Sequence, residues 1–546
     1  MAQKRLFTGP PVASIEMLID VYPAAILVLY HVVTRSFPTL SSVFSRQVYR
    51  AFLVMVVGLC LLAKKPTARA ISSALGVVSH DALTRLLTHT CWNASLLMGA
   101  LLNQALLMTS GATLPSYLIL DDVLIPKPFA AWIAAAYWDW DHVEQRKVFC
   151  HRLVVVVWTN GVFVIPVAFA LWHKKHSAYF LNQTASFTHE EYTAFVEQFP
   201  HVRALLSPLV TFREDLVALA GGSLSGWQKQ LIGKEAFAVI ATHAANRHRY
   251  RTKNELARCL IYLVLRKGLR GEYITFDSWY ASKENLNFLT RLGVVYYAAI
   301  PCSRKVTRAF RVTSATQVQS EPLSVSKLAA TYTTRDYIPY PRGQLRALAL
   351  FVNLPGLNHG AKLVIIKRRD WHHFLKQSLP SHHPLHKQKD KDPNTYLLTN
   401  HIFCPTYEVI NRYRRRWTIE LMFRDLKQHL GLAACQHRSL TAVRRHIALA
   451  MFAYACLQLV RQEHLPSVTI HQHDHLTIGD VKKHLQSQVL GQLADTVSPG
   501  IITMVQRPMP VKVFEQITDS TTSTVISDYG FLTILSPDFK ELDNNA

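Results

Sequence analysis

The chain has 546 residues and carries 60 Lys and Arg against 36 Asp and Glu, a formal net charge of +24. This length allows roughly three or four domains of ~100–200 residues each. Because hydrophobic residues make up 49% and charged residues 18%, a disordered tail protein and a coiled coil are excluded. Positive charge spread along a chain with a large core indicates a polyanionic partner, nucleic acid before membrane. It makes a small-molecule enzyme the less favoured class.

Residues 1–115 are predicted to be helical. Apolar periodicity covers Ala13–Val33 and Phe44–Ala63, and Thr67–Leu87 is predicted to form two short helices around Gly76. The short pair is compatible with a helix-turn-helix that binds DNA ends and equally with an ordinary helical bundle. The sequence leaves both interpretations of this domain open.

From residue 116 the pattern changes to that of a mixed α/β layer. Strands are predicted at Tyr117–Leu120, Val148–Trp158, Val162–Trp172, Tyr273–Phe276 and Val294–Ile300, with a helix at Lys253–Lys267 before the fourth. Strands broken by helices in this order indicate an α/β core over residues 116–300.

The remainder divides into three parts. Residues 301–400 are predicted to be a β-rich insertion with strands at Ala347–Leu354, Ala361–Lys367 and Thr395–Leu398. Residues 401–462 are predicted to form one long helix, Tyr407–Leu430, and a second, Thr441–Gln462. Residues 463–546 are weakly periodic, and no element is predicted there.

Acidic residues are predicted to lie where strands end. Asp121 and Asp122 follow one apolar run, and Asp277 follows another. Ligand sites of α/β sheets lie at such strand ends. Carboxylates that converge there bind hard divalent cations such as Mg²⁺ or Mn²⁺, and two such ions support phosphodiester cleavage. The alternative is that each acid only caps a turn.

A second acidic position lies in an arginine-rich helix. Tyr413 is followed at offsets of 3, 7 and 14 by Arg416, Glu420 and Lys427. At 3.6 residues per turn these four side chains fall within roughly 60° of arc. The stripe combines a carboxylate for metal with Arg and Lys for phosphate. An ordinary salt-bridged helix face is the competing interpretation.

The same four residues carry a family resemblance. Their spacing matches the Tyr-(2)-Arg-(3)-Glu-(6)-Lys signature of one large branch of bacterial insertion-sequence DDE transposases. The segment Asp277–Tyr280 resembles the second motif of that branch, Asp-x-Gly-Tyr/Phe, with Trp279 in place of glycine. The segment Leu120–Val123 resembles the first motif, Asp-x-Thr, with Val123 in place of threonine. The resemblance covers residues 116 to about 461.

The resemblance implies a ribonuclease-H-like catalytic core interrupted by a β-rich insertion, with an N-terminal helical domain. It implies that Asp121, Asp277 and Glu420 hold two Mg²⁺ or Mn²⁺ ions; Asp121 is preferred to its neighbour Asp122 because it aligns with the motif. DNA contacts are implied for the other three signature residues and, as a base-stacking residue of the insertion, for Trp371.

The expected activity is metal-dependent DNA strand cleavage and strand transfer. The expected partners are double-stranded DNA, both terminal inverted repeats and target DNA, and a second copy in a homodimer. The protein is expected in the prokaryotic cytoplasm, on the nucleoid. The alternative is a catalytically inactive, transposase-derived DNA-binding protein.

A membrane protein is a third class to consider, because mean hydropathy is +0.09. The run Leu153–Trp172 is long enough to span a bilayer. Asn160-Gly161 interrupts it, however, and Asn-Gly between two Val/Ile/Phe-rich halves is a hairpin signal. No transmembrane segment is predicted.

Overall fold

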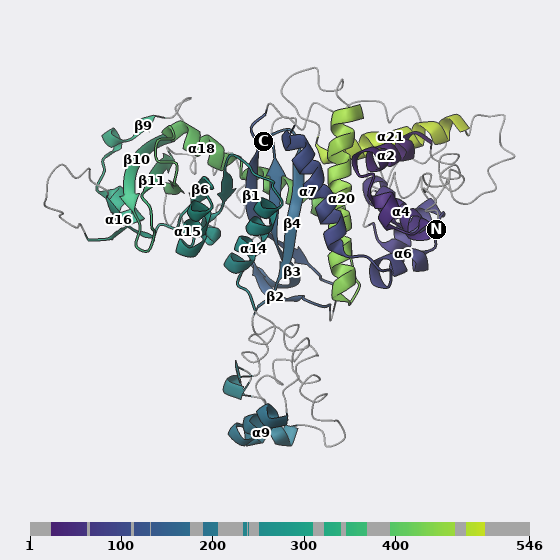
Figure 1. Ribbon diagram of the computed structural model, residues 1–546, viewed down its shortest axis with the longest axis horizontal. Coiled ribbons are helices and arrows are strands. Elements are labelled where there is room, and N and C mark those ends of the chain that lie inside the picture. The colour runs from purple at the N-terminus through teal and green to yellow at the C-terminus, as the bar shows by residue number, and fades with distance from the viewer. Residues whose placement is uncertain are drawn as a thin grey trace, which may run out of the picture. The chain divides into compact units, whose positions relative to one another are not determined.

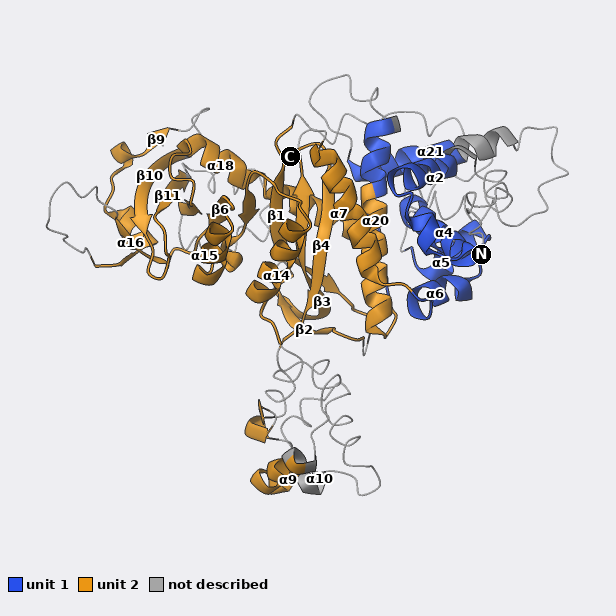
Figure 2. Ribbon diagram, in the orientation of Figure 1, with its two compact units in different colours: residues 1–91, 428–435, 456–546 blue, residues 92–427, 436–455 orange. Residues whose placement is uncertain are grey.

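The computed structural model describes residues 23–62, 66–110, 114–130, 133–142, 144–174, 189–205, 233–236, 238–239, 250–308, 321–339, 345–368, 394–464 and 477–496. The chain forms two compact units, coloured separately in Figure 2. Unit 1 contains residues 1–91, 428–435 and 456–546, and unit 2 contains residues 92–427 and 436–455.

Unit 1 is helical over the residues described. Its helices are α2 (Pro23–Ser36), α3 (Leu40–Val43), α4 (Arg46–Leu61), α5 (Ala68–Leu75), α6 (His80–Thr88) and α21 (Ile478–Thr496). The predicted pair of short helices is confirmed as α5 and α6. Thr67 and Ser79 cap their N-termini through side-chain oxygens, and Gly76 ends α5 with a φ of +64° that favours glycine.

Helix α21 has no counterpart among the predicted elements, and it packs against α2 and α4. Its Lys482 side chain donates to the carbonyl of Leu59 at 3.1 Å, and Gln486 donates to that of Leu61 at 2.6 Å. These carbonyls belong to the last turn of α4, where no intrahelical donor is available. The two side chains therefore complete the C-terminus of α4.

Unit 2 is built on a 12-stranded mixed sheet covered by helices, so the α/β prediction is confirmed. Its strands are β1 (Tyr117–Pro126), β2 (Tyr137–Asp141), β3 (Arg146–Thr159), β4 (Val164–Trp172), β5 (Ile274–Phe276), β6 (Tyr296–Ala299), β7 (Lys305–Arg308), β8 (Leu323–Ser324), β9 (Ile338–Pro339), β10 (Leu345–Asn353), β11 (Ala361–Arg368) and β12 (Asn394–Thr399). The eight strands predicted from the sequence are all present, whereas β2 and the short strands β7 to β9 were not predicted.

The strand order through the sheet is β2-β3-β1-β5-β6-β12-β11-β10-β7-β8, with β4 paired to β3 and β9 to β10. Strands β1, β5 and β6 run parallel, and the remaining pairs are antiparallel. The strands of residues 301–400 join the sheet through the β12–β6 pair. The parallel centre places the C-terminal end of β5 beside Leu120, in the middle of β1.

The hairpin predicted at Asn160-Gly161 is confirmed between β3 and β4. The Asn160 side-chain oxygen accepts from the backbone amides of Val162 and Phe163 at 3.1 and 2.9 Å. Gly161 has a φ of +86°, a conformation that other residues rarely adopt. The apolar run Leu153–Trp172 is therefore two strands of a sheet.

Helices of unit 2 cover the sheet in Figure 1: α7 packs on β4, and α14 packs on β3 and β4. The helices are α7 (Ala94–Ser110), α9 (His189–Gln198), α10 (Pro200–Leu205), α14 (Lys253–Arg266), α15 (Lys283–Arg291), α16 (Val325–Ala330), α18 (Thr406–Arg414) and α19 (Trp417–Gln428). Helix α20 (Leu440–His464) is divided between the two units. Its segment Leu440–Glu463 is apolar and long enough to cross a membrane by composition, and 83% of that apolar window is buried within the structure.

The prediction of one unbroken helix over Tyr407–Leu430 is wrong. Helix α18 ends at Arg414 and α19 begins at Trp417. Between them each backbone hydrogen bond spans three residues instead of the four of an α-helix. The amide of Arg416 donates to the carbonyl of Tyr413 at 2.9 Å, and the amide of Thr418 donates to the carbonyl of Arg415 at 3.2 Å. Such a 3₁₀-type turn changes the phase of side chains on either side of it.

Candidate active site

Two carboxylates meet at the centre of the parallel strands. Leu120 of β1 is in register with Phe276, the last residue of β5, so Asp121 on β1 lies next to Asp277, the residue that follows β5. Asp277 accepts a hydrogen bond at Oδ1 from the amide of Trp279 at 3.1 Å, which starts a 3₁₀ turn. Asp277 thus follows its strand directly, as predicted.

The prediction that Asp121 and its neighbour Asp122 end their strand is wrong, because β1 continues to Pro126. Val123 and Ile125 in that extension are buried, and β3 pairs with β1 along its whole length. The charged pair therefore lies inside a strand.

Burial changes the protonation of the two acids. Burial, assisted by the nearby charge of Asp277, raises the pKa of Asp121 to about 8 although Arg416 opposes the shift. Burial and the charge of Asp122 also raise the pKa of Asp277. Two acids that share a buried position cannot both be ionised cheaply unless a cation lies close by.

Arg416 supplies a cation between Asp121 and Glu420. Its Nη1 lies 2.7 Å from Oδ2 of Asp121, and its Nη2 donates to Oε1 of Glu420, one turn along α19. The Arg416 and Asp121 side chains are 16% and 13% exposed, and that of Glu420 is 33% exposed. One guanidinium therefore joins carboxylates from β1 and α19 in a partly buried position.

Two further arginines hold the end of α18 against the parallel strands. The Arg412 guanidinium lies 5.3 and 5.5 Å from the ring centroids of Tyr273 and Tyr297, and it donates to the Tyr297 hydroxyl at 2.8 Å. Arg415 lies 5.5 Å from the ring centroid of Tyr117 and donates to the Tyr273 hydroxyl at 3.3 Å. These contacts fix the turn from which Arg416 reaches the acids.

Asp122 enters a separate ion-pair network. Arg152 Nη1 and Lys253 Nζ lie 2.7 and 3.2 Å from its carboxylate oxygens, and the Tyr280 hydroxyl donates to it at 2.9 Å. Arg152 also pairs with Asp139 at 2.6 Å. Because the Asp122 side chain is only 9% exposed and has three partners, it is a structural anchor of β1.

The signature residues are only partly brought together. The Tyr413 ring centroid lies 5.9 Å from the Arg416 guanidinium. Burial raises the pKa of Tyr413, with the charges of Asp277 and Asp121 contributing. Tyr413, Arg416 and Glu420 therefore face the acids as one group.

Lys427 lies apart from that group. It is exposed at the end of α19, and the charged groups that act on it are Asp141, Arg152 and Glu144. The predicted stacking residue, Trp371, lies outside the described residues.

The donor chemistry of the site fits a divalent cation. Asp121, Asp277 and Glu420 offer only carboxylate oxygens, the ligands that Mg²⁺ and Mn²⁺ prefer. Within the part of the chain that the structure describes, no three His, Cys, Asp or Glu side chains lie close enough to hold a metal ion. Ligation by all three acids therefore requires the Arg416 bridge to open and Glu420 to move in.

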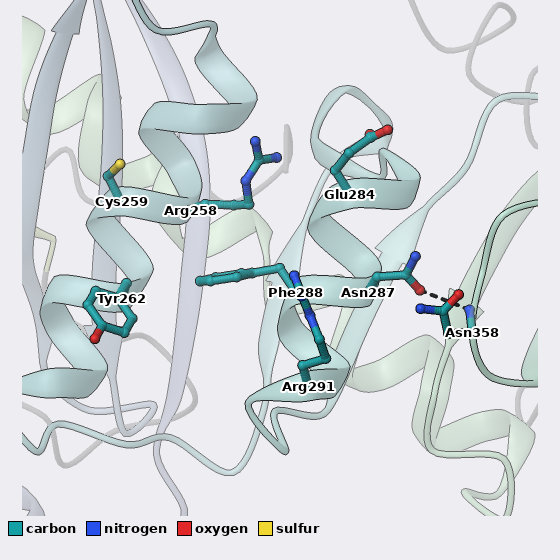
Figure 3. A pocket seen from close by; sticks show the side chains of 8 residues that line it. All are labelled: Arg258, Cys259, Tyr262, Glu284, Asn287, Phe288, Arg291 and Asn358. Carbon is teal, nitrogen blue, oxygen red and sulfur yellow. Dashed lines mark hydrogen bonds between the residues drawn. The ribbon is translucent and has the colours of Figure 1, made fainter. Parts of the chain in front are cut away.

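A pocket of about 580 Å³ lies beside this site, between α14 and α15 (Figure 3). Its walls are formed by Arg258, Cys259, Tyr262, Glu284, Asn287, Phe288, Arg291 and Asn358. Arg258 donates to the Asn285 side chain at 2.7 Å, and Asn285 donates to the carbonyl of Tyr280 at 2.9 Å. The pocket therefore shares a hydrogen-bonded wall with the turn that follows Asp277, but none of the three acids lines it.

Sequence reasoning missed the partners that hold these groups. Tyr280 carried a signal, since it is the aromatic residue of the second motif. Arg415 carried one as a member of an arginine run in the signature helix. No sequence signal identified Arg152 and Lys253, because their partner Asp122 is 30 and 131 residues away in the chain.

Two family models match the chain. The model described as the transposase DDE domain matches residues 235–456, which include Asp277 and Glu420. The model described as DDE superfamily endonuclease matches residues 39–186, which include Asp121. The two matches together cover the three acids.

Individual proteins are similar over different spans. A Sinorhizobium fredii protein described as transposase y4zB is 41% identical over 73 residues, which is 13% of this chain and 20% of that protein. The cryo-EM structure of a piggyBac transposase synaptic complex with hairpin DNA covers 96% of this chain and 90% of its own, at 9% identity and a TM-score of 0.38. The family-model matches and the short similarity to a transposase support a DDE transposase.

Proposed function

We propose that this chain is an insertion-sequence DDE transposase that cleaves DNA strands and transfers them with divalent metal. The observation that carries the proposal is that Arg416 pairs with both Asp121 of β1 and Glu420 of α19, while Asp277 directly follows β5, the strand paired with β1. Three acids from three distant segments have no structural need to lie near one another, whereas a nuclease site requires it.

We further propose a ribonuclease-H-like core. Its support is the order β4-β3-β1-β5-β6, in which β3 and β4 are antiparallel neighbours and β1, β5 and β6 are parallel. The resemblance places the first Asp on the first strand, the second Asp on the fourth and the Glu on a late helix. The three acids occur in that order along the chain, with Asp277 one residue past the end of β5. The Tyr-(2)-Arg-(3)-Glu-(6)-Lys branch is part of the same proposal.

Asp121, Asp277 and Glu420 are the residues proposed to hold Mg²⁺ or Mn²⁺, two ions in the active complex. Bound there, such ions activate the attacking oxygen and stabilise the leaving oxygen of a phosphodiester. The protein must first deprotonate Asp121, whose pKa of about 8 falls when a cation replaces its proton. Asp122 keeps β1 in place through its own partners.

Arg416 changes partner in this proposal. Its guanidinium pairs with Asp121 and Glu420, and planar guanidinium groups bind phosphate with two parallel hydrogen bonds. A DNA phosphate would therefore draw Arg416 away and leave both carboxylates free for metal. Tyr413 lies beside it and would hold the same phosphate through its hydroxyl.

The proposed substrates are terminal inverted repeats and target DNA, bound by a homodimer in the prokaryotic cytoplasm. The net charge of +24 supports a polyanionic partner. A catalytically inactive DNA-binding relative remains the alternative, and cleavage by the wild-type protein separates the two.

The test is a strand-cleavage assay on DNA that carries the inverted repeats flanking the gene. Glu420→Gln keeps the side-chain shape but removes the charge needed by a hard cation, so cleavage in Mg²⁺ should fall by roughly a hundredfold or more while end-DNA binding stays largely intact. Asp277→Asn should behave alike. Glu284→Gln, on the exposed start of α15, is the matched control and should cleave as wild type. Cleavage by Glu420→Gln near the wild-type rate would remove Glu420 from the site.

A further inference from the structure

A large aromatic side chain stands exposed beside the acids. Trp279 is two residues after Asp277 and is 60% exposed, and its backbone amide donates to the Asp277 carboxylate at 3.1 Å. An exposed hydrophobic residue by itself needs no explanation. Trp279 differs because its backbone is tied to a proposed metal ligand.

The indole has one contact with a fixed cation. Lys253 Nζ lies 4.1 Å from the ring centroid of Trp279, a cation–π contact. Lys253 is itself buried and fixed by Asp122 at 3.2 Å, and Tyr280, the next residue after Trp279, donates to the same carboxylate at 2.9 Å. Buried contacts therefore surround the turn, while the indole remains largely in solvent.

The neighbouring acids indicate what covers the indole. Lys253, Arg152 and Arg416 are each paired with a carboxylate there, so the indole lies beside the acids that are proposed to act on a phosphodiester. The net charge of +24 attracts a polyanion to the protein as a whole. Of the parts of DNA, only a base offers an apolar face of matching shape. Aromatic side chains stack on bases without regard to sequence, because every base has a π-face.

We propose that Trp279 is a stacking site for an unpaired nucleobase at the DNA strand end, next to the phosphate that the three acids act on. This inference rests on the proposed function, because it names the part of the DNA that the same site binds. The sequence motif that Asp277–Tyr280 resembles has glycine where this chain has Trp279, so the stacking site is a property of this chain. A base held there orients its own phosphate toward Asp277.

The test uses a pre-cleaved end duplex with 2-aminopurine as the unpaired terminal base, in buffer without divalent metal. Wild-type protein should quench the 2-aminopurine fluorescence by stacking. Trp279→Phe keeps an aromatic face and should retain most of the quenching. Trp279→Leu should lose it and bind this DNA roughly 5- to 150-fold more weakly, with a smaller loss on a fully paired duplex.

Trp138 provides the matched control, since it is 63% exposed on β2 and has no hydrogen bond to the acids. Trp138→Leu should bind and quench as wild type. Wild-type quenching by Trp279→Leu, or an equal loss in Trp138→Leu, would overturn the proposal. A drop in self-association without DNA, with quenching intact in Trp279→Leu, would also overturn it, because the indole would then belong to a protein interface.

The two proposals fail separately. If the wild-type protein cleaves end DNA in Mg²⁺ but Trp279→Leu quenches normally, only the stacking site is lost. If wild-type protein quenches 2-aminopurine but never cleaves, the nuclease assignment is lost and the stacking site stands. Equal melting temperatures of Trp279→Leu and Trp279→Phe show that a difference between them reflects the aromatic face.

Discussion

Replacing Asp121 by Asn should make the metal-free protein more stable at high pH. Burial beside Asp277 raises the pKa of Asp121 to about 8, from an ordinary value of 3.8. Between these two pKa values the folded protein keeps a proton on Asp121 that the unfolded chain has released. The folded state therefore binds more protons, and wild-type stability falls as pH rises from about 4 to about 8. The asparagine side chain of the variant cannot ionise, so the variant lacks this loss.

The size of the effect follows from the shift. About four pKa units at ~1.4 kcal/mol each give an upper limit of roughly 6 kcal/mol. Asp121 and Asp277 titrate as a pair, so part of the penalty stays on Asp277 in the variant, and roughly 2–3 kcal/mol is expected. At roughly 2–4 °C per kcal/mol for a domain of 150–250 residues, the melting temperature should rise by about 5 °C at pH 9.

The assay is thermal unfolding of wild-type protein and Asp121→Asn from pH 5 to pH 9, in chelator and in Mg²⁺. The two curves should lie close together at pH 5 and separate as pH rises, and Mg²⁺ should stabilise only the wild type at pH 9. Asp139→Asn is a control of opposite sign. Burial raises the pKa of Asp139, but Lys174 and Arg152 together lower it by more, so the net pKa lies below the ordinary value. This variant should therefore be less stable than wild type above about pH 4. Parallel curves for wild type and Asp121→Asn would refute the buried-acid reasoning.

Three further predictions concern the signature residues. Arg416→Gln should bind Mn²⁺ more tightly than wild type at pH 9 without DNA, measured by electron paramagnetic resonance, because no guanidinium then competes for the two carboxylates; equal affinity would show that the bridge does not exclude metal. Lys427→Ala should reduce the slope of log affinity against log salt by about one for cleaved-end DNA, whereas an altered preference among end sequences with an unchanged slope would mean that Lys427 contacts bases. Tyr413→Phe should weaken binding of the cleaved end by only ~0.5–1.5 kcal/mol in a titration, the value of one hydroxyl hydrogen bond, and a loss well above this range would contradict a single-bond role.

Local chemistry explains why many elements could be predicted from the sequence. The β3–β4 hairpin depends on Asn160 and Gly161, and the α5–α6 pair depends on Thr67, Gly76 and Ser79. In each case the deciding hydrogen bond or backbone angle lies within a few residues, so the signal is present in a short window.

The site was predictable only as far as local periodicity reaches. Tyr413, Arg416 and Glu420 fall on one side because they are a turn or two apart. The 3₁₀-type turn around Arg415 is a tertiary effect, since Arg415 packs on Tyr117 and Tyr273. Periodicity assumed an unbroken helix and could not show that turn.

Asp122 illustrates the other limit. Two adjacent carboxylates after an apolar run are typical of a strand end, because unpaired buried charges are costly. Arg152, Lys253 and Tyr280 remove that cost from three distant segments. The strand can therefore continue through the charged pair, and only the folded chain shows it.

The most direct test of the central claim is the position of Mn²⁺ in a crystal of the protein bound to pre-cleaved end DNA, located by anomalous scattering. Mn²⁺ should lie within ~2.0–2.5 Å of carboxylate oxygens of Asp121 and Asp277, with Glu420 released from Arg416 and Arg416 on a DNA phosphate. Mn²⁺ on Asp122 instead of Asp121, or DNA bound with the Arg416 bridge intact and no metal at the acids, would contradict the proposed site.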